Sequence, residues 1–331
     1  MVAVIDYSRP LATLLRESTH EAHDAVATSK GAKLLLSGTL AREEYVRYLM
    51  MLWHIYDAIE RALDKHASHP VLEPTYNPTL LARAPALSAD IAHLLDVDEG
   101  SWRTHPIYRE LATPSLPDPL AAYVARIEEL AGGGVDPSPL LAHAYVRYLG
   151  DLSGGQSMRH ILAKAYGLDE AEGLGIEFYA FKELKSAKAA GLGEMKRIKE
   201  WYREGMTKGG EGRDVDVLAS IVNETGTAFK LNAGLFETIR HITIEQAEAE
   251  ANGKDLEEEE QVNGTESRVV YDGTKAESAG SYSISSVLAV IVAMCAAHFV
   301  LVVGGFTGNA GYQKLIAFEE WVAGVWKTTV N

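Results

Sequence analysis

Apolar positions recur with a helical period over most of the first 245 residues. The longest regular run predicts a helix over 42–66, because its apolar residues repeat at i, i+3, i+4 and i+7. The same spacing predicts further helices over 11–27, 120–130, 139–166, 196–202 and 217–244. Segments with the two-residue period of strands are scarce. The pattern therefore predicts one all-α domain over residues 1–245.

The hydropathy pattern changes twice after this domain. Residues 246–283 are polar and acidic, and their apolar residues are too sparse to offset the entropy of folding, which predicts a flexible linker. Residues 284–306 then form an apolar run without Asp, Glu, Lys or Arg. About 20 such residues span a bilayer core of ~30 Å. A buried core helix is the alternative, but the sequence favours a C-terminal transmembrane helix, followed by a short tail over 307–331.

The charge and the cysteine content limit the partners and the cellular compartment that fit this chain. The formal net charge of −15 disfavours nucleic acid as a partner, and the single Cys295 excludes an internal disulfide and fits a reducing compartment. The first residues show no signal sequence, so we expect a tail anchor in the endoplasmic reticulum membrane with the large helical domain in the cytosol. Residues 182–208 reverse the overall balance with 8 basic against 4 acidic residues. This segment suits an anionic ligand or an acidic partner, or is a solvated helix face.

Three glycines, Gly150, Gly154 and Gly155, lie within six residues of the predicted helix over 139–166. Each costs roughly 1 kcal/mol in a helix relative to alanine. Such a cluster indicates either a kink or the close approach of something large and flat to the backbone. Periodicity alone slightly favours a packing kink or a helix end.

The residues around these glycines carry a resemblance to a known family. Residues 145–156, YVRYLGDLSGGQ, are similar to the distal-helix signature of haem oxygenases, and residues 15–23 resemble the proximal helix that supplies the iron ligand. Residues 53–56, 199–203 and 227–236 resemble other helices of the same family, in the same order. The resemblance covers residues 10–245 and implies an all-α domain with haem between a proximal and a kinked distal helix.

The resemblance assigns roles residue by residue. It implies that His23 is the iron ligand, that Asp151 orders water on the distal side, and that Arg147 and Tyr56 belong to the same network. Tyr56 and the aromatic residues near the last helix are equally compatible with plain core positions. The residues that match haem-pocket positions of the family are Tyr145, Gly150, Ser153, Gly154, Phe229, Asn232 and Phe236. Matches to basic positions near the haem propionates are Arg16, Lys199 and Arg203.

Two positions depart from better-known animal members of the family. Ala27 stands where a glutamate four residues after the ligand can orient it, so we expect His23 to use a backbone carbonyl, such as that of Thr19, or water. Val146 replaces a frequent threonine. His20 is close to His23 in sequence, but it lies about 60° around the helix and is expected on the surface.

The activity implied by the family is oxidative cleavage of haem to biliverdin, ferrous iron and carbon monoxide by dioxygen. Haem is then substrate and cofactor, and electrons are expected from NADPH through a flavin reductase. Two other functions fit parts of the sequence. One is a haem-binding sensor or carrier without chemistry, which Asp151, Arg147 and Tyr56 argue against. The other is a membrane-tethered adaptor, which predicts no haem affinity.

Overall fold

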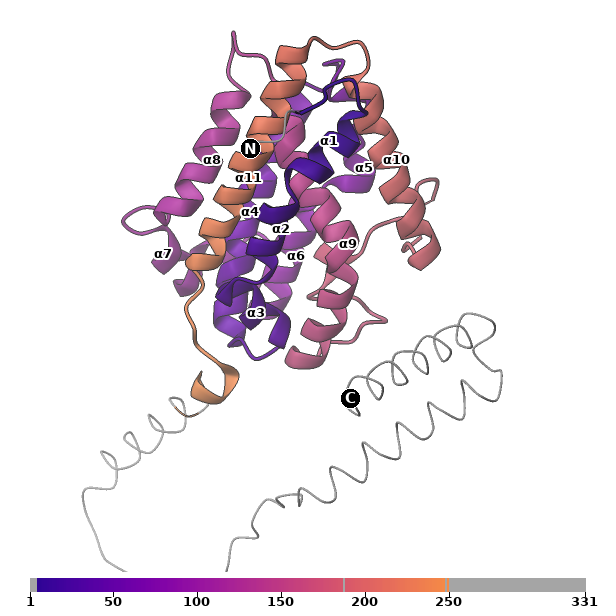
Figure 1. Ribbon diagram of the computed structural model, residues 1–331. Coiled ribbons are helices and arrows are strands. Elements are labelled where there is room, and N and C mark those ends of the chain that lie inside the picture. Colours follow the sequence, from indigo (N-terminus) through magenta and orange to yellow (C-terminus); the bar gives the residue numbers. More distant parts are fainter. Residues whose placement is uncertain (1–4, 187, 248, 250–331) are drawn as a thin grey trace, which may run out of the picture. The chain divides into compact units, whose positions relative to one another are not determined.

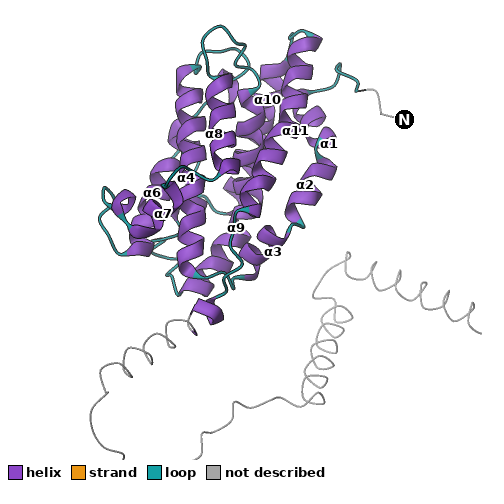
Figure 2. Cartoon of the chain, turned by 90° about the vertical axis from the view of Figure 1, so that its left-hand side faces the viewer, coloured by secondary structure: helices purple, strands orange, loops and turns teal. Residues whose placement is uncertain are grey.

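The structure is a computed structural model that describes residues 5–186, 188–247 and 249. Within these residues, extended backbone pairs only at two isolated bridges, Leu40 with Thr243 and Lys182 with Ala189. Figure 2 shows the rest of the regular structure as helix. The predicted all-α class is therefore confirmed for the described part of the chain.

The structure does not test the predictions for the C-terminal segments. The membrane span over 284–306, the tail over 307–331 and nearly all of the linker over 246–283 lie outside the described residues. Among the helices that the structure does describe, none has the length and apolarity to cross a bilayer.

The described chain forms helices α1 to α11 and three short 3₁₀ turns, and residues 244–247 are also helical. The helices are α1 (Leu11–Ser18), α2 (His20–Ala27), α3 (Lys30–Ser37), α4 (Arg42–Lys65), α5 (Pro78–Leu81), α6 (Ala84–Leu95), α7 (Pro106–Ala112), α8 (Asp118–Leu130), α9 (Leu140–Tyr166), α10 (Leu192–Gly210) and α11 (Val215–Glu237). The 3₁₀ turns are η1 (Glu73–Thr75), η2 (Trp102–Thr104) and η3 (Glu177–Tyr179).

Helix α4 lies at the centre of this bundle and packs against α6, α7, α8 and α9. It is buried around most of its circumference, including the phenol rings of Tyr45, Tyr48 and Tyr56. A helix that is apolar on several faces belongs in the interior. Figure 1 shows α1, α2 and α3 following one another across one face, between α11 and α9. The N-terminal helices therefore cover the long helices, and α1 and α3 contribute Leu11, Leu14, Leu15 and Leu35 to the core.

Two predicted helices agree closely with the structure. The prediction over 42–66 corresponds to α4, and that over 120–130 corresponds to α8. The glycine-containing segment over 139–166 is helical at every position of α9, so the expected break in the helix does not occur. The prediction over 196–202 was too short for α10, and that over 217–244 ran past the end of α11 at Glu237. Helices α3, α5, α6 and α7 were not predicted.

The helix predicted over 11–27 is interrupted at Thr19, which separates α1 from α2. Thr19 has φ −114° and ψ 5°, and its buried hydroxyl donates to the Leu15 carbonyl at 2.7 Å. A threonine side chain that bonds back to the preceding turn competes with the regular helical ladder. The break gives α2 its own direction and places His23 on a short separate helix.

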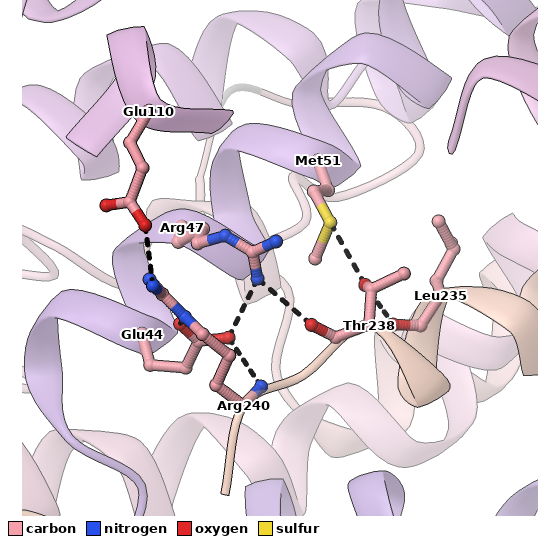
Figure 3. A network of polar contacts seen from close by, with 7 residues as sticks. All are labelled: Glu44, Arg47, Met51, Glu110, Leu235, Thr238 and Arg240. Carbon is pink, nitrogen blue, oxygen red and sulfur yellow. Dashed lines mark hydrogen bonds and ion pairs between the residues drawn. The ribbon is translucent and has the colours of Figure 1, made fainter. Parts of the chain in front are cut away.

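A buried charged network ties the chain after α11 to the start of α4 (Figure 3). Glu44 is 1% exposed and accepts from Arg47 at 2.9 Å and from the Arg240 side chain at 2.7 Å. The Arg240 backbone N–H also donates to Glu44, at 2.8 Å, while Arg47 reaches the Thr238 carbonyl at 3.0 Å. One buried carboxylate therefore fixes the exit of the chain from α11.

We expect Glu44→Ala to lower the free energy of unfolding by about 3 kcal/mol, because it leaves the buried guanidinium of Arg47 without its carboxylate. Urea unfolding measures this change. Glu110→Ala is the matched control, since Glu110 is 63% exposed and pairs with the same Arg240 at 2.7 Å. Removal of an exposed partner costs less than about 1 kcal/mol. Equal losses in the two variants would contradict a special role for Glu44.

Candidate active site

A cavity of about 820 Å³ lies between the proximal helix α2 and the distal helix α9. Residues of α1, α3, α4, α10, α11 and η3 complete its walls. Much of its lining is apolar or aromatic, with a few charged side chains. The apolar and aromatic lining includes Ala12, Val26, Leu35, Tyr48, Leu52, Tyr145, Val146, Leu149, Met158, Phe178, Tyr179, Phe229 and Phe236. A large apolar pocket with few polar groups is the usual form of a ligand site.

The distal wall exposes backbone where α9 lacks side chains. Gly150 and Gly154 line the cavity, and a Cβ added to either would meet no atom within 4 Å. Gly155 differs, because its Cβ would lie 3.1 Å from the Tyr179 ring. The first two glycines thus leave room for a flat group against α9, and the third allows close packing of η3. Of the two sequence interpretations, the structure favours close approach of a ligand over a helix break.

A buried polar cluster stands behind the distal wall. Arg147 donates to Asn232 at 2.7 Å and to the Tyr56 hydroxyl at 3.2 Å, and its guanidinium lies 3.7 Å from Asp151. The Tyr56 hydroxyl donates to the other oxygen of Asp151. Tyr56 is 0% exposed, whereas Arg147, Asp151 and Asn232 all line the cavity. The cluster therefore joins α4, α9 and α11 and presents the Asp151 carboxylate to the cavity.

Burial governs the protonation of this cluster. Removal from water raises the pKa of Asp151, while the Arg147 charge and the hydrogen bond from Tyr56 act in the opposite direction. Burial also raises the pKa of Tyr56 well above its ordinary value, so this hydroxyl stays protonated and serves as a donor. Asp151 therefore exchanges a proton nearer to neutral pH than an exposed aspartate does.

His23 lies on the opposite wall, on α2. Its side chain is 68% exposed, lines the cavity and stands edge-on to Phe229 with ring centroids 6.4 Å apart. The Thr19 carbonyl accepts the His23 backbone N–H at 2.8 Å, and the His23 ring instead contacts Asp24, with 3.2 Å between Nδ1 and Oδ1. The ring contacts this carboxylate and not the expected Thr19 carbonyl, whereas its orientation by water stays a prediction. His20 is 77% exposed, as predicted.

Charged residues from α1, and from α10 and its C-terminal end, line the cavity. Arg16 from α1 and Arg203 from α10 both line it, together with Glu204 and Glu211. Lys199, which was predicted to act beside Arg203, is half-exposed one turn earlier on α10 and does not line the cavity. Two side chains four residues apart share a helix face, but they are one turn apart along the axis, so both need not reach the same cavity. Two of the three predicted cations therefore line the cavity.

The remaining predicted pocket residues can be compared directly with the cavity. Those that line it are Tyr145, Gly150, Ser153, Gly154, Phe229, Asn232 and Phe236. Tyr56 does not line it, but its hydroxyl contacts two residues that do, Asp151 and Arg147. Tyr48 lines the cavity although the sequence analysis gave it no site role. Its position eight residues before Tyr56 on α4, about two helical turns, is a signal that could have found it.

The turn η3 forms a wall that the sequence analysis missed. The buried carboxylate of Asp90 accepts the backbone N–H groups of Glu177 and Phe178, each at 2.8 Å. Arg83 donates to the carbonyls of Phe178 at 3.3 Å and Ala180 at 2.8 Å. Burial raises the pKa of Asp90 to about 7, although the hydrogen bonds from the two backbone N–H groups act in the opposite direction. These long-range bonds leave no periodic signal in the sequence.

Comparisons with known proteins agree with this architecture. The family described as "Heme oxygenase" matches residues 9–238. "Heme oxygenase 1" from Pongo abelii is 33% identical over 249 residues, which are 73% of this chain and 77% of that protein. The solved heme oxygenase from Leptospira interrogans has a TM-score of 0.57 at 30% identity and covers 69% of this chain and 98% of its own.

A second solved structure contains a ligand. Heme oxygenase-1 from the cyanobacterium Synechocystis, in complex with heme, has a TM-score of 0.59 at 28% identity and covers 75% of this chain and 100% of its own.

We expect Gly154→Leu to abolish binding of haemin, the planar probe suggested by the sequence, because the new side chain would project into the cavity. Leucine favours a helix over glycine by up to ~1 kcal/mol, so thermal stability should not fall. Absorption titration and a melting curve measure both effects. Gly226→Leu on α11 is the control, because its Cβ also meets open space but outside the cavity. Unchanged haemin binding by Gly154→Leu would contradict this use of the distal glycines.

Proposed function

The chain belongs to the haem oxygenase family of enzymes, and we propose that it oxidises haem to biliverdin, ferrous iron and carbon monoxide. The observation that carries this proposal is the cavity with His23 on one wall and Asp151, Gly150 and Gly154 on the other. Haem supplies the iron that activates dioxygen and the porphyrin ring that is oxidised. The protein supplies the ligand, the orientation and the protons.

The residues of the cavity fit haem chemically. A neutral imidazole is a good axial ligand for haem iron, and His23 is the histidine that lines the cavity in the described part of the chain. The opposite wall carries no side chain at Gly150 and Gly154, so a flat ring can approach the backbone of α9. Aromatic rings of Tyr145 and Phe229 add apolar contact area. These features together support a planar apolar ligand that carries a metal.

Asp151 has the task of handling protons on the distal side. Its carboxylate faces the cavity, accepts from Tyr56 and lies near Arg147, so both its position and its orientation are fixed from behind. A carboxylate held in this way can order water and exchange a proton at its oxygen without serving as an iron ligand. The Arg147 charge offsets part of the free-energy cost of burying the ionised carboxylate. Asn232 in turn accepts a hydrogen bond from Arg147 and holds it in place. Proton delivery through such a positioned group contributes ~10²–10⁴-fold to a reaction.

Arg16 and Arg203 are the groups best placed to hold the two carboxylates of haem. Both line the cavity and both are exposed, so they can pair with propionates at the edge of the ring. Glu204 and Glu211 also line the cavity. Pairing of the propionates with Arg16 and Arg203 would fix the rotation of the ring, which decides which bridging carbon faces Asp151.

Reducing equivalents would come from NADPH through a flavin reductase. The basic excess within residues 182–208 supports an acidic partner that docks near the exposed edge of the cavity. Lys199 is half-exposed on α10 and is therefore better placed for this surface than for haem. We assign it to partner docking in this proposal.

The test is turnover by the purified full-length protein with haemin, NADPH and a flavin reductase. We expect biliverdin from the unmodified protein, a reduction of about 10²-fold or more for Asp151→Ala, and loss of the histidine-ligated spectrum for His23→Ala. Asp57→Asn is the control, since Asp57 neighbours Tyr56 on α4 but pairs with Arg61 at 2.8 Å and does not line the cavity. A stable ferrous complex without turnover would favour a sensor or carrier, and an unchanged haemin spectrum would favour an adaptor.

The proposal includes attachment to a membrane, with the endoplasmic reticulum as the expected site and the helical domain in the cytosol. The uninterrupted apolar run over 284–306 supports it. We expect the full-length chain to float with liposomes in a density gradient and to resist extraction by alkaline carbonate. A chain ending at residue 283 should remain in the soluble fraction and retain turnover. Equal partition of both chains would exclude this segment as the anchor.

A further inference from the structure

The second nitrogen of the His23 ring has a partner that the family pattern does not provide. His23 Nδ1 lies 3.2 Å from Asp24 Oδ1, and His20 Nδ1 lies 3.1 Å from Asp24 Oδ2. One carboxylate thus lies between two imidazoles on the same short helix. An ionised carboxylate only accepts hydrogen bonds, so its contact with His23 requires the hydrogen on Nδ1 and leaves the Nε2 lone pair free for a metal.

We propose that Asp24 is the positioning residue of His23, and that His20 helps to hold Asp24 in place. This inference rests on the proposed function, in which His23 binds the haem iron. A ligand histidine commonly donates its other N–H to a carboxylate or carbonyl, which fixes the tautomer and raises the basicity of the ligand. Ala27 offers only a methyl group one turn after His23, so this chain needs another source of that carboxylate. The adjacent residue Asp24 supplies it.

Two features separate this role from an ordinary surface charge. Asp24 is the fifth residue of α2, beyond the first turn in which an acid stabilises the helix dipole, whereas Glu21 lies in that turn. His20 and Asp24 are four residues apart, so they share a helix face and can pair. This pairing restricts the Asp24 side chain, which is otherwise 60% exposed and free to leave His23. His20 therefore acts on the ligand only through Asp24.

The experiment compares Asp24→Ala and Asp24→Asn with Glu21→Gln in the full-length protein. Resonance Raman spectroscopy of the ferrous haem complex measures the iron–histidine stretching frequency, and redox titration measures the midpoint potential. We expect Asp24→Ala to lower the frequency, raise the potential and weaken haem binding by about 10-fold. Asp24→Asn should give an intermediate shift, because an amide oxygen accepts a weaker hydrogen bond. Asp24→Glu should recover part of the frequency, and Glu21→Gln should match the unmodified protein.

A measurement on the ligand-free protein gives an independent readout. Nitrogen chemical shifts of the His23 ring report which nitrogen carries the hydrogen, and we expect Asp24→Ala to lower the fraction protonated at Nδ1. His20→Ala should change the tautomer and the Raman frequency in the same direction, but less. Unchanged tautomer and frequency in Asp24→Ala would overturn this inference while haem binding by His23 stands. A His23→Ala protein that keeps the same iron–histidine band would instead overturn the proposed ligand and this inference with it.

Discussion

The buried guanidinium of Arg147 is the constraint on which the site depends. Only 7% of this residue is exposed, and a buried cation is tolerated only when hydrogen bonds and counter-charges replace its water. Its partners are Tyr56 on α4, Asp151 on α9 and Asn232 on α11. Three long helices must therefore keep a fixed register to satisfy one side chain. The same arrangement orients Asp151 toward the cavity.

This constraint extends outward through packed rings and backbone. The Phe178 ring meets Tyr56 edge-on with centroids 5.5 Å apart, and the Phe178 backbone is held by Asp90 and Arg83. A line of contacts thus runs from α6 through η3 to the hydroxyl that bonds Asp151. Polar groups fixed in this way need little reorganisation when charge develops beside them, which is the main requirement for electrostatic catalysis. The distal wall is therefore organised by contacts within the protein itself.

The sequence predicted the parts that local patterns encode. Helix α4 was predicted well because its apolar spacing is regular over its whole length, and the positions of His23 and Asp151 on opposite walls followed from the family motifs. The break at Thr19 was missed because one side-chain hydrogen bond to the preceding turn decides it. The η3 wall was missed because Asp90, far away in sequence, holds it. Long-range bonds of this kind leave no period to detect.

The proximal wall differs from the distal wall in what stabilises it. No residue of α2 is fully buried, and an isolated helix of eight residues is unstable in water, so packing must hold it. The packing available is the contact of half-buried Ala22 and Val26 with Val146, Ala228 and Phe229. A planar ligand in the cavity would add apolar area to this contact, and a bond to His23 would fix one end of α2. A carboxylate at Asp24 that orients the His23 ring lowers the entropy cost of forming that bond.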